Sequence, residues 1–246
     1  MRPLLAVLLL AFLLPAGAQE PRTIAVLSLI GDSLTILKNE EKIGSNLDRS
    51  RRSRVDLDSP ALDHSTLRSV AREMKRIEPG AKTVLLGVRS KELFEAQARA
   101  LDAGPGIQRV FDHVKPYLGQ AGNATHLLLV TKHRSNTRTE LYNAVVGEGL
   151  LEGLGFYVDA NMPLKDLKTG ELFEGFFAPF TYFLVSLVDL KDGTVTQHTV
   201  TSTRVVSDAK SATAWQALTG AQKVKMLEDM VGAGLAEALP RVLRSH

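Results

Sequence analysis

Ser33 is the residue of this chain that best fits the position of a nucleophile. It follows the apolar run Thr23 to Ile30 through Gly31 and Asp32, in the stretch TIAVLSLIGDSLTILK. A serine placed there would lie at the end of a buried strand, where its hydroxyl can meet a substrate. Since a serine hydroxyl is a poor nucleophile without a neighbouring base, the histidines decide whether this chemistry exists.

The five residues Gly31-Asp32-Ser33-Leu34-Thr35 resemble the first block of the GDSL, or SGNH, ester hydrolases. The resemblance implies that Ser33 is the nucleophile and that a late Asp-x-x-His supplies the base. None of the six histidines has an aspartate three residues before it, and the Gly-x-Asn-Asp block of that family is missing. His198 is the one late histidine within the folded region, so a divergent hydrolase using Ser33 and His198 is the alternative hypothesis.

The same stretch also fits a β-hairpin. A second apolar run, Leu34 to Leu37, follows the Gly-Asp pair, and two short apolar runs around such a turn are typical of a hairpin. In this interpretation Ser33 performs no chemistry. We predict the hairpin, and we favour a protein without enzymatic activity.

The first 18 residues have the three parts of a secretory signal. Arg2 provides the positive charge, Leu4 to Leu14 the apolar run, and Ala16-Gly17-Ala18 the small-residue cleavage site. The apolar run is shorter than the roughly 18 residues of a membrane span, and no later stretch is as apolar for as long. We therefore expect cleavage after Ala18, a periplasmic or secreted mature chain, and no transmembrane segment.

The composition limits the chemistry further. With no cysteine, the chain has neither disulfides nor thiolate metal sites. The acids near the predicted helix start at Pro60 are explained by capping, so we expect no metal site, and the absence of nucleotide-binding motifs gives no reason to expect a cofactor. A net charge of only +3 in an exported chain also argues against a nucleic-acid partner.

Two segments are candidate contact surfaces. Four arginines fall within six residues of a predicted loop, where they would suit an anionic component of the cell envelope or an envelope protein. Four phenylalanines of the segment FEGFFAPF would form a protein-binding or membrane-surface patch if exposed, and a lid over the sheet edge if buried. The candidates are Arg49, Arg51, Arg52, Arg54, Phe173, Phe176, Phe177 and Phe180.

The order of the elements predicts a single α/β domain for residues 19 to 246, with α+β as the alternative. We expect a mixed sheet with an N-terminal hairpin, helices packed on the sheet, a Gly/Phe-rich insertion at about 134 to 180, and a C-terminal helix. Further elements are predicted as helices at 60–77, 90–101 and 107–118, interior strands at 83–88 and 127–131, and a hairpin at 181–190 and 194–206.

This organisation is loosely similar to the α/β domains of the curli-export lipoprotein and of the lipoprotein activators of cell-wall synthases. The similarity implies a binding or accessory role in the envelope. It rests on the order of the elements alone, and fold similarity by itself does not assign a function.

Overall fold

A computed structural model describes residues 22–39, 46–47, 50–102, 107–141, 144–165, 170, 172–206 and 215–244. The predicted signal at residues 1 to 18 lies outside this part. The strands are β1 (Thr23–Ser28), β2 (Ser33–Asn39), β3 (Arg51–Asp56), β4 (Lys82–Leu86), β5 (His126–Lys132), β6 (Arg134–Leu141), β7 (Ala144–Glu152), β8 (Leu154–Lys165), β9 (Leu172–Asp189) and β10 (Val195–Thr203). The helices are α1 (Ala61–Ile77), α2 (Lys91–Asp102), α3 (Ile107–Val114), the 3₁₀ helix η2 (Lys115–Ala121) and α5 (Gly220–Leu243).

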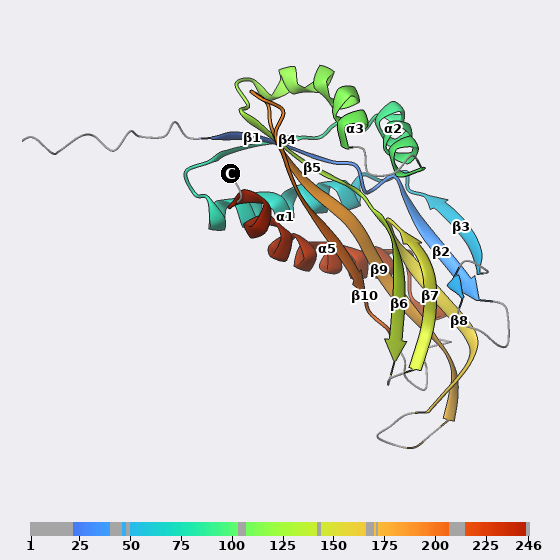
Figure 1. Cartoon of the computed structure of the whole chain (residues 1–246). Helices are drawn as coiled ribbons and strands as arrows, with labels where there is room; N and C mark the ends of the chain where they lie inside the picture. The colour runs from blue at the N-terminus through green and yellow to red at the C-terminus, as the bar shows by residue number, and fades with distance from the viewer. Residues whose placement is uncertain are drawn as a thin grey trace, which may run out of the picture.

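The main sheet has eight strands, with the order β3-β2-β8-β9-β5-β1-β4 and with β10 paired to β9 (Figure 1). Strand β1 runs parallel to β4 and β5, and β2 runs parallel to β8, whereas the other pairs of this sheet are antiparallel. The predicted mixed sheet with packed helices and a C-terminal helix is therefore confirmed.

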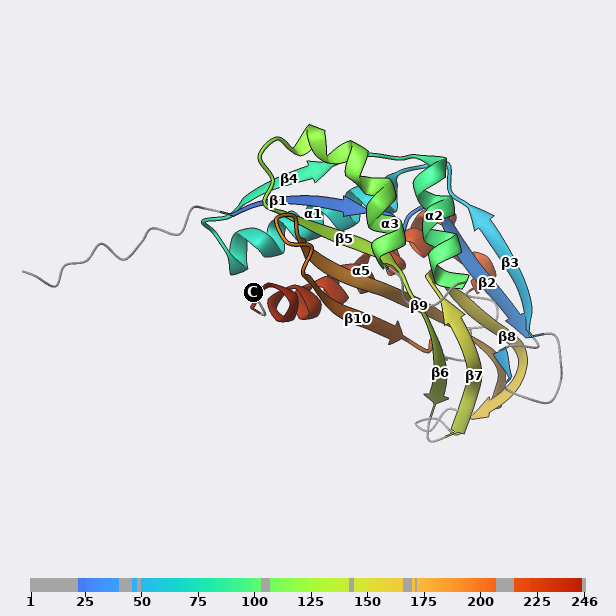
Figure 2. The same ribbon diagram turned by 45° about the horizontal axis from the view of Figure 1, so that its top comes forward.

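The long strand β9 joins two halves of this sheet. Its first part pairs with β8 and its last part with β5. Because β1 pairs with β5 and β2 pairs with β8, the consecutive strands β1 and β2 follow each other along the sheet (Figure 2). The predicted hairpin turn at Gly31 to Ser33 is thus wrong. The N-terminal antiparallel pair is instead formed by β2 and β3.

Three further expectations need correction. The predicted arginine loop contains an edge strand, β3, and the predicted interior strand at 83–88 is the edge strand β4. Residues 134 to 180 are not one insertion, because β8 and β9 belong to the main sheet. Only β6 and β7 form a separate two-stranded sheet.

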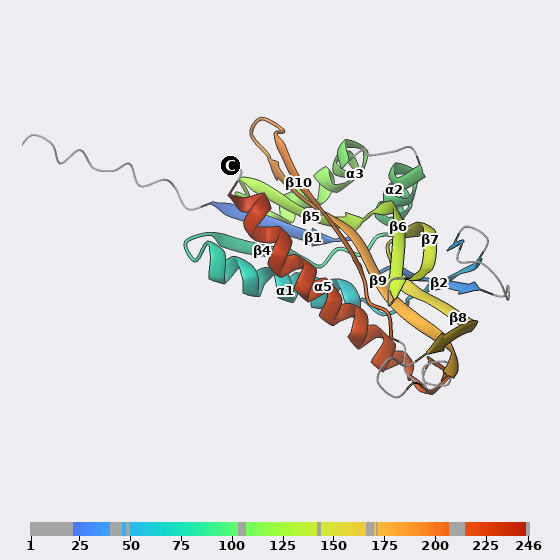
Figure 3. The same cartoon turned by 60° about the horizontal axis from the view of Figure 1, so that its bottom comes forward.

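Helices α1 and α5 lie side by side across one face of the sheet (Figure 3). Helix α5 starts with the predicted capping box, in which Thr219 and Gln222 bond each other's backbone amides. Apolar residues then recur every three or four positions on both helices, so each buries one stripe. This core includes Leu67, Val70, Met74, Leu227, Val231 and Leu235.

The opposite face is covered by two separate units (Figure 2). Helices α2 and α3 cover the half of the sheet that contains β1 and β5, around Leu27, Leu129 and Phe111. The β6–β7 hairpin covers the other half, around Tyr157 and Phe180. Among the described residues, no helix combines the length and the apolar character that crossing a membrane requires.

Candidate functional site

The two halves of the sheet meet where β5 gives way to β8. The amide of His133 donates to the carbonyl of Tyr182, and the amide of Gly153 donates to the carbonyl of His133, each at 3.0 Å. The β6–β7 hairpin leaves the sheet between these two residues and returns to it. The chain between β1 and β2 lies next to these residues. We call this region, where β1 and β5 end and β2 and β8 begin, the junction.

A charged side chain crosses the junction. The Lys132 ammonium lies 2.5 Å from Asp32 Oδ1, and it donates to Ser33 Oγ at 2.8 Å and to the Ser33 carbonyl at 3.1 Å. The side chains of Lys132 and Asp32 are only 9% and 10% exposed. Asp32 Oδ1 has no well-aligned hydrogen bond, so its attraction to Lys132 is mainly coulombic.

Asp32 has two further partners. Its Oδ2 accepts from the Arg54 guanidinium at 2.7 Å and from the Ser33 hydroxyl at 3.2 Å. Gly153 makes room for the lysine, because a Cβ at this residue would lie 2.9 Å from Lys132 Cδ, and its φ of +65° favours glycine. The network therefore joins β2, β3 and β5 around one buried positive charge.

A second carboxylate holds the loop before Ser33. Asp63 Oδ1, in the first turn of α1, accepts from Ser28 Oγ at 2.7 Å and from the amides of Ile30 and Gly31 at 3.1 and 3.0 Å. Burial raises the pKa of Asp63, and these three hydrogen bonds oppose the rise. A Cβ at Gly31 would lie 2.6 Å from Asp63 Oδ2, so the glycine permits this approach. Asp63 thus holds a loop in place, a role that the expected helix capping does not describe.

These contacts decide what Ser33 can do in this conformation. Its hydroxyl donates to Asp32 and accepts from Lys132, and no histidine is among its partners in the described structure. Three oxygens surround the Lys132 ammonium, so its N–H groups are already engaged with Asp32 and Ser33. His198 lies on β10 opposite Val185, a position that gives Ser33 no hydrogen bond. The structure therefore does not assemble the pair Ser33 and His198.

Lys132 is the residue of this network that the sequence pattern did not single out. It follows the apolar run of β5 and lies 99 positions from Ser33. A charged residue at the end of a buried strand is the one local signal that the sequence contained. Such a residue usually meets water, but here Asp32, Ser33 and Gly153 enclose it.

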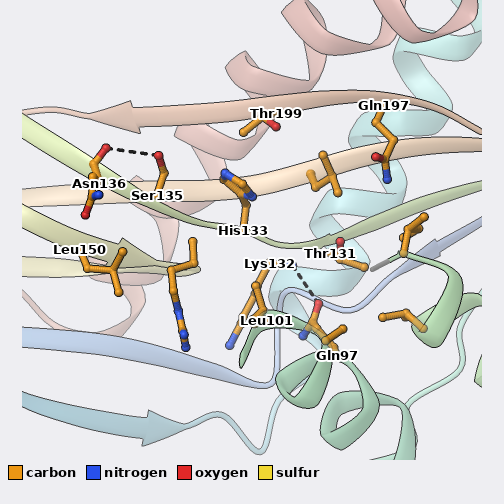
Figure 4. A pocket seen from close by; sticks show the side chains of 15 residues that line it. Gln97, Leu101, Thr131, Lys132, His133, Ser135, Asn136, Leu150, Gln197 and Thr199 are labelled. Carbon is orange, nitrogen blue, oxygen red and sulfur yellow. Dashed lines mark hydrogen bonds between the residues drawn. The ribbon is translucent and has the colours of Figure 1, made fainter. Parts of the chain in front are cut away.

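A pocket of about 460 Å³ lies near the junction, between the two covers of the sheet, and we call it the seam pocket. Its surface is mainly apolar. Helices α2 and α3 form one wall, the β6–β7 hairpin the other, and β5, β9 and β10 the floor (Figure 4). The lining residues are Gln97, Ala100, Leu101, Ile107, Val110, Thr131, Lys132, His133, Arg134, Ser135, Asn136, Leu150, Leu184, Gln197 and Thr199.

The side chain of His133 lies in the seam pocket, next to its floor of strands. The side chain of the neighbouring Lys132 extends in the opposite direction (Figure 4). Desolvation by burial lowers the pKa of His133 below its ordinary 6.5, so the imidazole is neutral at pH 7. Its ring nitrogens have no hydrogen-bond partner among the described residues. A neutral imidazole offers one donor and one acceptor, so this ring can bind a group that both accepts and donates.

Two side chains fix the walls of the seam pocket. Gln97 of α2 donates to the Leu29 carbonyl and accepts from the Lys132 amide, both at 2.8 Å, and so ties α2 to β1 and β5. Arg134 of the hairpin pairs with Asp102 at the end of α2 at 3.1 Å and with Glu152 of β7 at 2.5 Å. The helices and the hairpin are therefore held at a set separation.

The two contact surfaces expected from the sequence have different outcomes. Phe176, Phe177 and Phe180 are buried in β9, an interior strand of the main sheet, so they form neither an exposed patch nor the expected lid over the sheet edge. The arginines of β3 are exposed, but Arg52 donates to the Leu150 carbonyl at 2.9 Å and Arg54 pairs with Asp32 and Asp56. Arg49 and the side chain of Phe173 lie outside the described residues.

Replacing Lys132 tests the energetic importance of the junction. Lys132→Met removes the buried one of the two cations that pair with Asp32, so we expect the free energy of unfolding in urea to fall by about 3 kcal/mol, the low end for a broken buried pair because Arg54 remains. The matched control is Lys225→Met, which breaks the exposed pair with Asp229 on α5 and should cost less than about 0.5 kcal/mol. Equal effects of the two variants would contradict the assignment. If Lys132→Met does not fold, the double variant Asp32→Asn/Lys132→Met should recover folding.

No family model and no curated protein matches this chain. Among solved structures, it is similar to an uncharacterized protein, with 10% identity over 89% of this chain and 90% of the other and a TM-score of 0.37. Two dodecamer structures of PelC from Paraburkholderia phytofirmans match with TM-scores of 0.29. Their identities are 12% and 13%, over 88% of this chain and 87% and 86% of theirs. TM-scores below 0.5 carry no functional argument, so the function must be argued from this chain's own geometry.

Proposed function

We propose that this chain is an exported, non-enzymatic binding module of the cell envelope, and that its ligand site is the seam pocket. The observation that carries the proposal is the neutral, unpartnered imidazole of His133 in a largely apolar pocket of about 460 Å³. This size lies within the range of roughly 300–1,000 Å³ that is usual for small-molecule sites. An apolar cavity with a few polar groups is what a binding site needs to hold and orient a ligand.

The contacts of the two other candidate surfaces favour the seam pocket over them. The phenylalanines of β9 are buried, so neither a membrane surface nor a partner protein can reach Phe176, Phe177 and Phe180. Arg52 and Arg54 of β3 already bond within the chain, and an anionic partner would have to compete with those bonds. A ligand that bonds the His133 ring would not have to break a hydrogen bond of that ring within the described structure.

A bulky side chain at the rim of the seam pocket should block binding. Thr199 of β10 is exposed and lines the pocket, so Thr199→Trp fills the opening without disturbing the core. We expect the uncharged dye N-phenyl-1-naphthylamine to fluoresce with the wild-type protein and to bind Thr199→Trp about tenfold more weakly. The matched control is Thr201→Trp, on the same face of the same strand but outside the pocket, which should bind the dye like wild type. Equal binding by all three proteins would refute the site.

Export is tested by the N-terminus of the protein made in cells. The signal at residues 1 to 18 leads us to expect that the protein recovered from the periplasm or the medium begins at Gln19. Ala18→Asp should block cleavage, because a small residue is needed before the cleaved bond. A wild-type chain that stays in the cytoplasm with its first residues intact would contradict export.

A serine hydrolase is the second candidate, and one distance favours it. Lys132 Nζ lies 2.8 Å from Ser33 Oγ, which is the reach that a lysine base would need. The ion pair of the same ammonium with Asp32, at 2.5 Å, opposes this role, because the carboxylate competes with Ser33 for the lysine. We therefore expect no labelling of Ser33 by a fluorophosphonate probe. Labelling that disappears in Ser33→Ala and in Lys132→Met, but not in His198→Ala, would establish the hydrolase instead.

A further inference from the structure

The charges around the seam pocket restrict the ligand more than its size does. Besides His133, the titratable lining residues are Lys132 and Arg134. Lys132 directs its ammonium to Asp32 and Ser33, away from the pocket. Arg134 is held between Asp102 and Glu152. Both cations near the pocket are therefore already neutralised.

Among the described residues that line the pocket, an anionic ligand would find no available counter-charge. Two carboxylates accompany Arg134, so the charge at the hairpin end of the pocket sums to minus one. Burying a carboxylate or phosphate beside an apolar surface without a paired cation costs several kcal/mol. The pocket thus disfavours fatty acids and other anions, even though its apolar walls would suit their chains.

The polar groups that remain are neutral. The His133 ring can donate through one nitrogen and accept through the other. Gln197 donates through Nε2 to Ser186 Oγ at 3.0 Å, and its carbonyl oxygen can accept a further hydrogen bond. Thr199 lies on the same face of β10 and adds a hydroxyl. A hydroxyl or an amide on the ligand can bond these groups without any change of protonation.

We propose that the seam pocket binds a small, uncharged molecule with an apolar body and one hydroxyl or amide head, and that His133 hydrogen-bonds that head. The proposal rests on the proposed function, because it names the ligand class of the same site. The apolar body lies along Ala100, Leu101, Ile107, Leu150 and Leu184, where it removes apolar surface from water. The head takes the place of water at the His133 ring.

Three probes that share one alkyl chain test the ligand class. Decanol, decanoate and decyltrimethylammonium are compared by displacement of N-phenyl-1-naphthylamine at about pH 7.5, where His133 is neutral. We expect decanol to bind at least about tenfold more tightly than either charged probe. Tighter binding of decanoate or of the ammonium would overturn the proposal.

The role of His133 is tested by substitution and by titration. We expect His133→Phe, which keeps a ring of similar shape, to weaken decanol binding by about tenfold through loss of the hydrogen bond. The matched control His198→Phe changes a histidine of β10 outside the pocket lining and should have no effect. Since decanol would remove further water from the ring, the pKa of His133 measured by NMR should fall when decanol is added. An unchanged or raised pKa would contradict the contact.

Failure of this inference differs from failure of the proposed function. If Thr199→Trp blocks the dye but a charged probe binds best, the site stands and the ligand class is wrong. If Thr199→Trp and Thr201→Trp bind the dye and all three probes alike, the seam pocket is not the binding site and both proposals fall.

Discussion

The buried ion pair between Lys132 and Asp32 is the interaction on which the middle of this fold depends. The chain breaks its strands twice at one place, between β1 and β2 and between β5 and β8. Each break exposes backbone groups that no ladder satisfies, and buried groups of this kind need partners. Lys132 supplies one by bonding the Ser33 carbonyl, and Asp63 supplies another by accepting from Ile30 and Gly31. The charges of the junction therefore support a point of the sheet where, of the strands around it, β9 alone runs through without a break.

The same divided sheet creates the seam pocket. If β5 continued within the sheet, one layer could cover its whole face. Instead the chain leaves the sheet after Lys132 to form the β6–β7 hairpin, which covers only the half around Tyr157 and Phe180. Helices α2 and α3 cover the other half. Gln97 and Arg134 fix the two covers to the junction and to each other, so the space between them is set by hydrogen bonds and ion pairs. Rigid walls of this kind lower the cost of ordering a bound ligand.

Charge is distributed in the opposite way in the two sites. At the junction, the cation of Lys132 and the carboxylate of Asp32 are brought together with water largely excluded. In the seam pocket, the charged groups are paired at one end, and the remaining polar groups are neutral. The first arrangement suits structure, because Lys132 and Asp32 are engaged with each other and with Ser33. The second suits binding, because a neutral imidazole in an apolar cavity has hydrogen-bonding capacity left over.

The sequence by itself determined the elements that depend on local patterns. The apolar periodicity and the Thr219–Gln222 capping box defined α5, the alternation around Gly193 defined the β9–β10 hairpin, and the order of helices and strands gave the α/β class. These features follow from contacts between residues close in the chain. The pairing of β1 was not of this kind. Its apolar residues fit a hairpin with β2 as well as they fit parallel pairing with β4 and β5, because the apolar pattern of a buried strand does not specify which strands pair with it.

Only the tertiary structure decided what Ser33 and the histidines can do. The motif around Ser33 suggested a nucleophile, yet the residue that reaches its hydroxyl is Lys132, which is 99 positions away and paired with Asp32. No sequence motif around His133 indicated a binding role. Its proposed role follows from its position in the seam pocket, between helices α2 and α3 and the β6–β7 hairpin. A side chain's protonation and its free hydrogen-bonding capacity depend on what folds against it, which is why the candidate site could not be read from the residues alone.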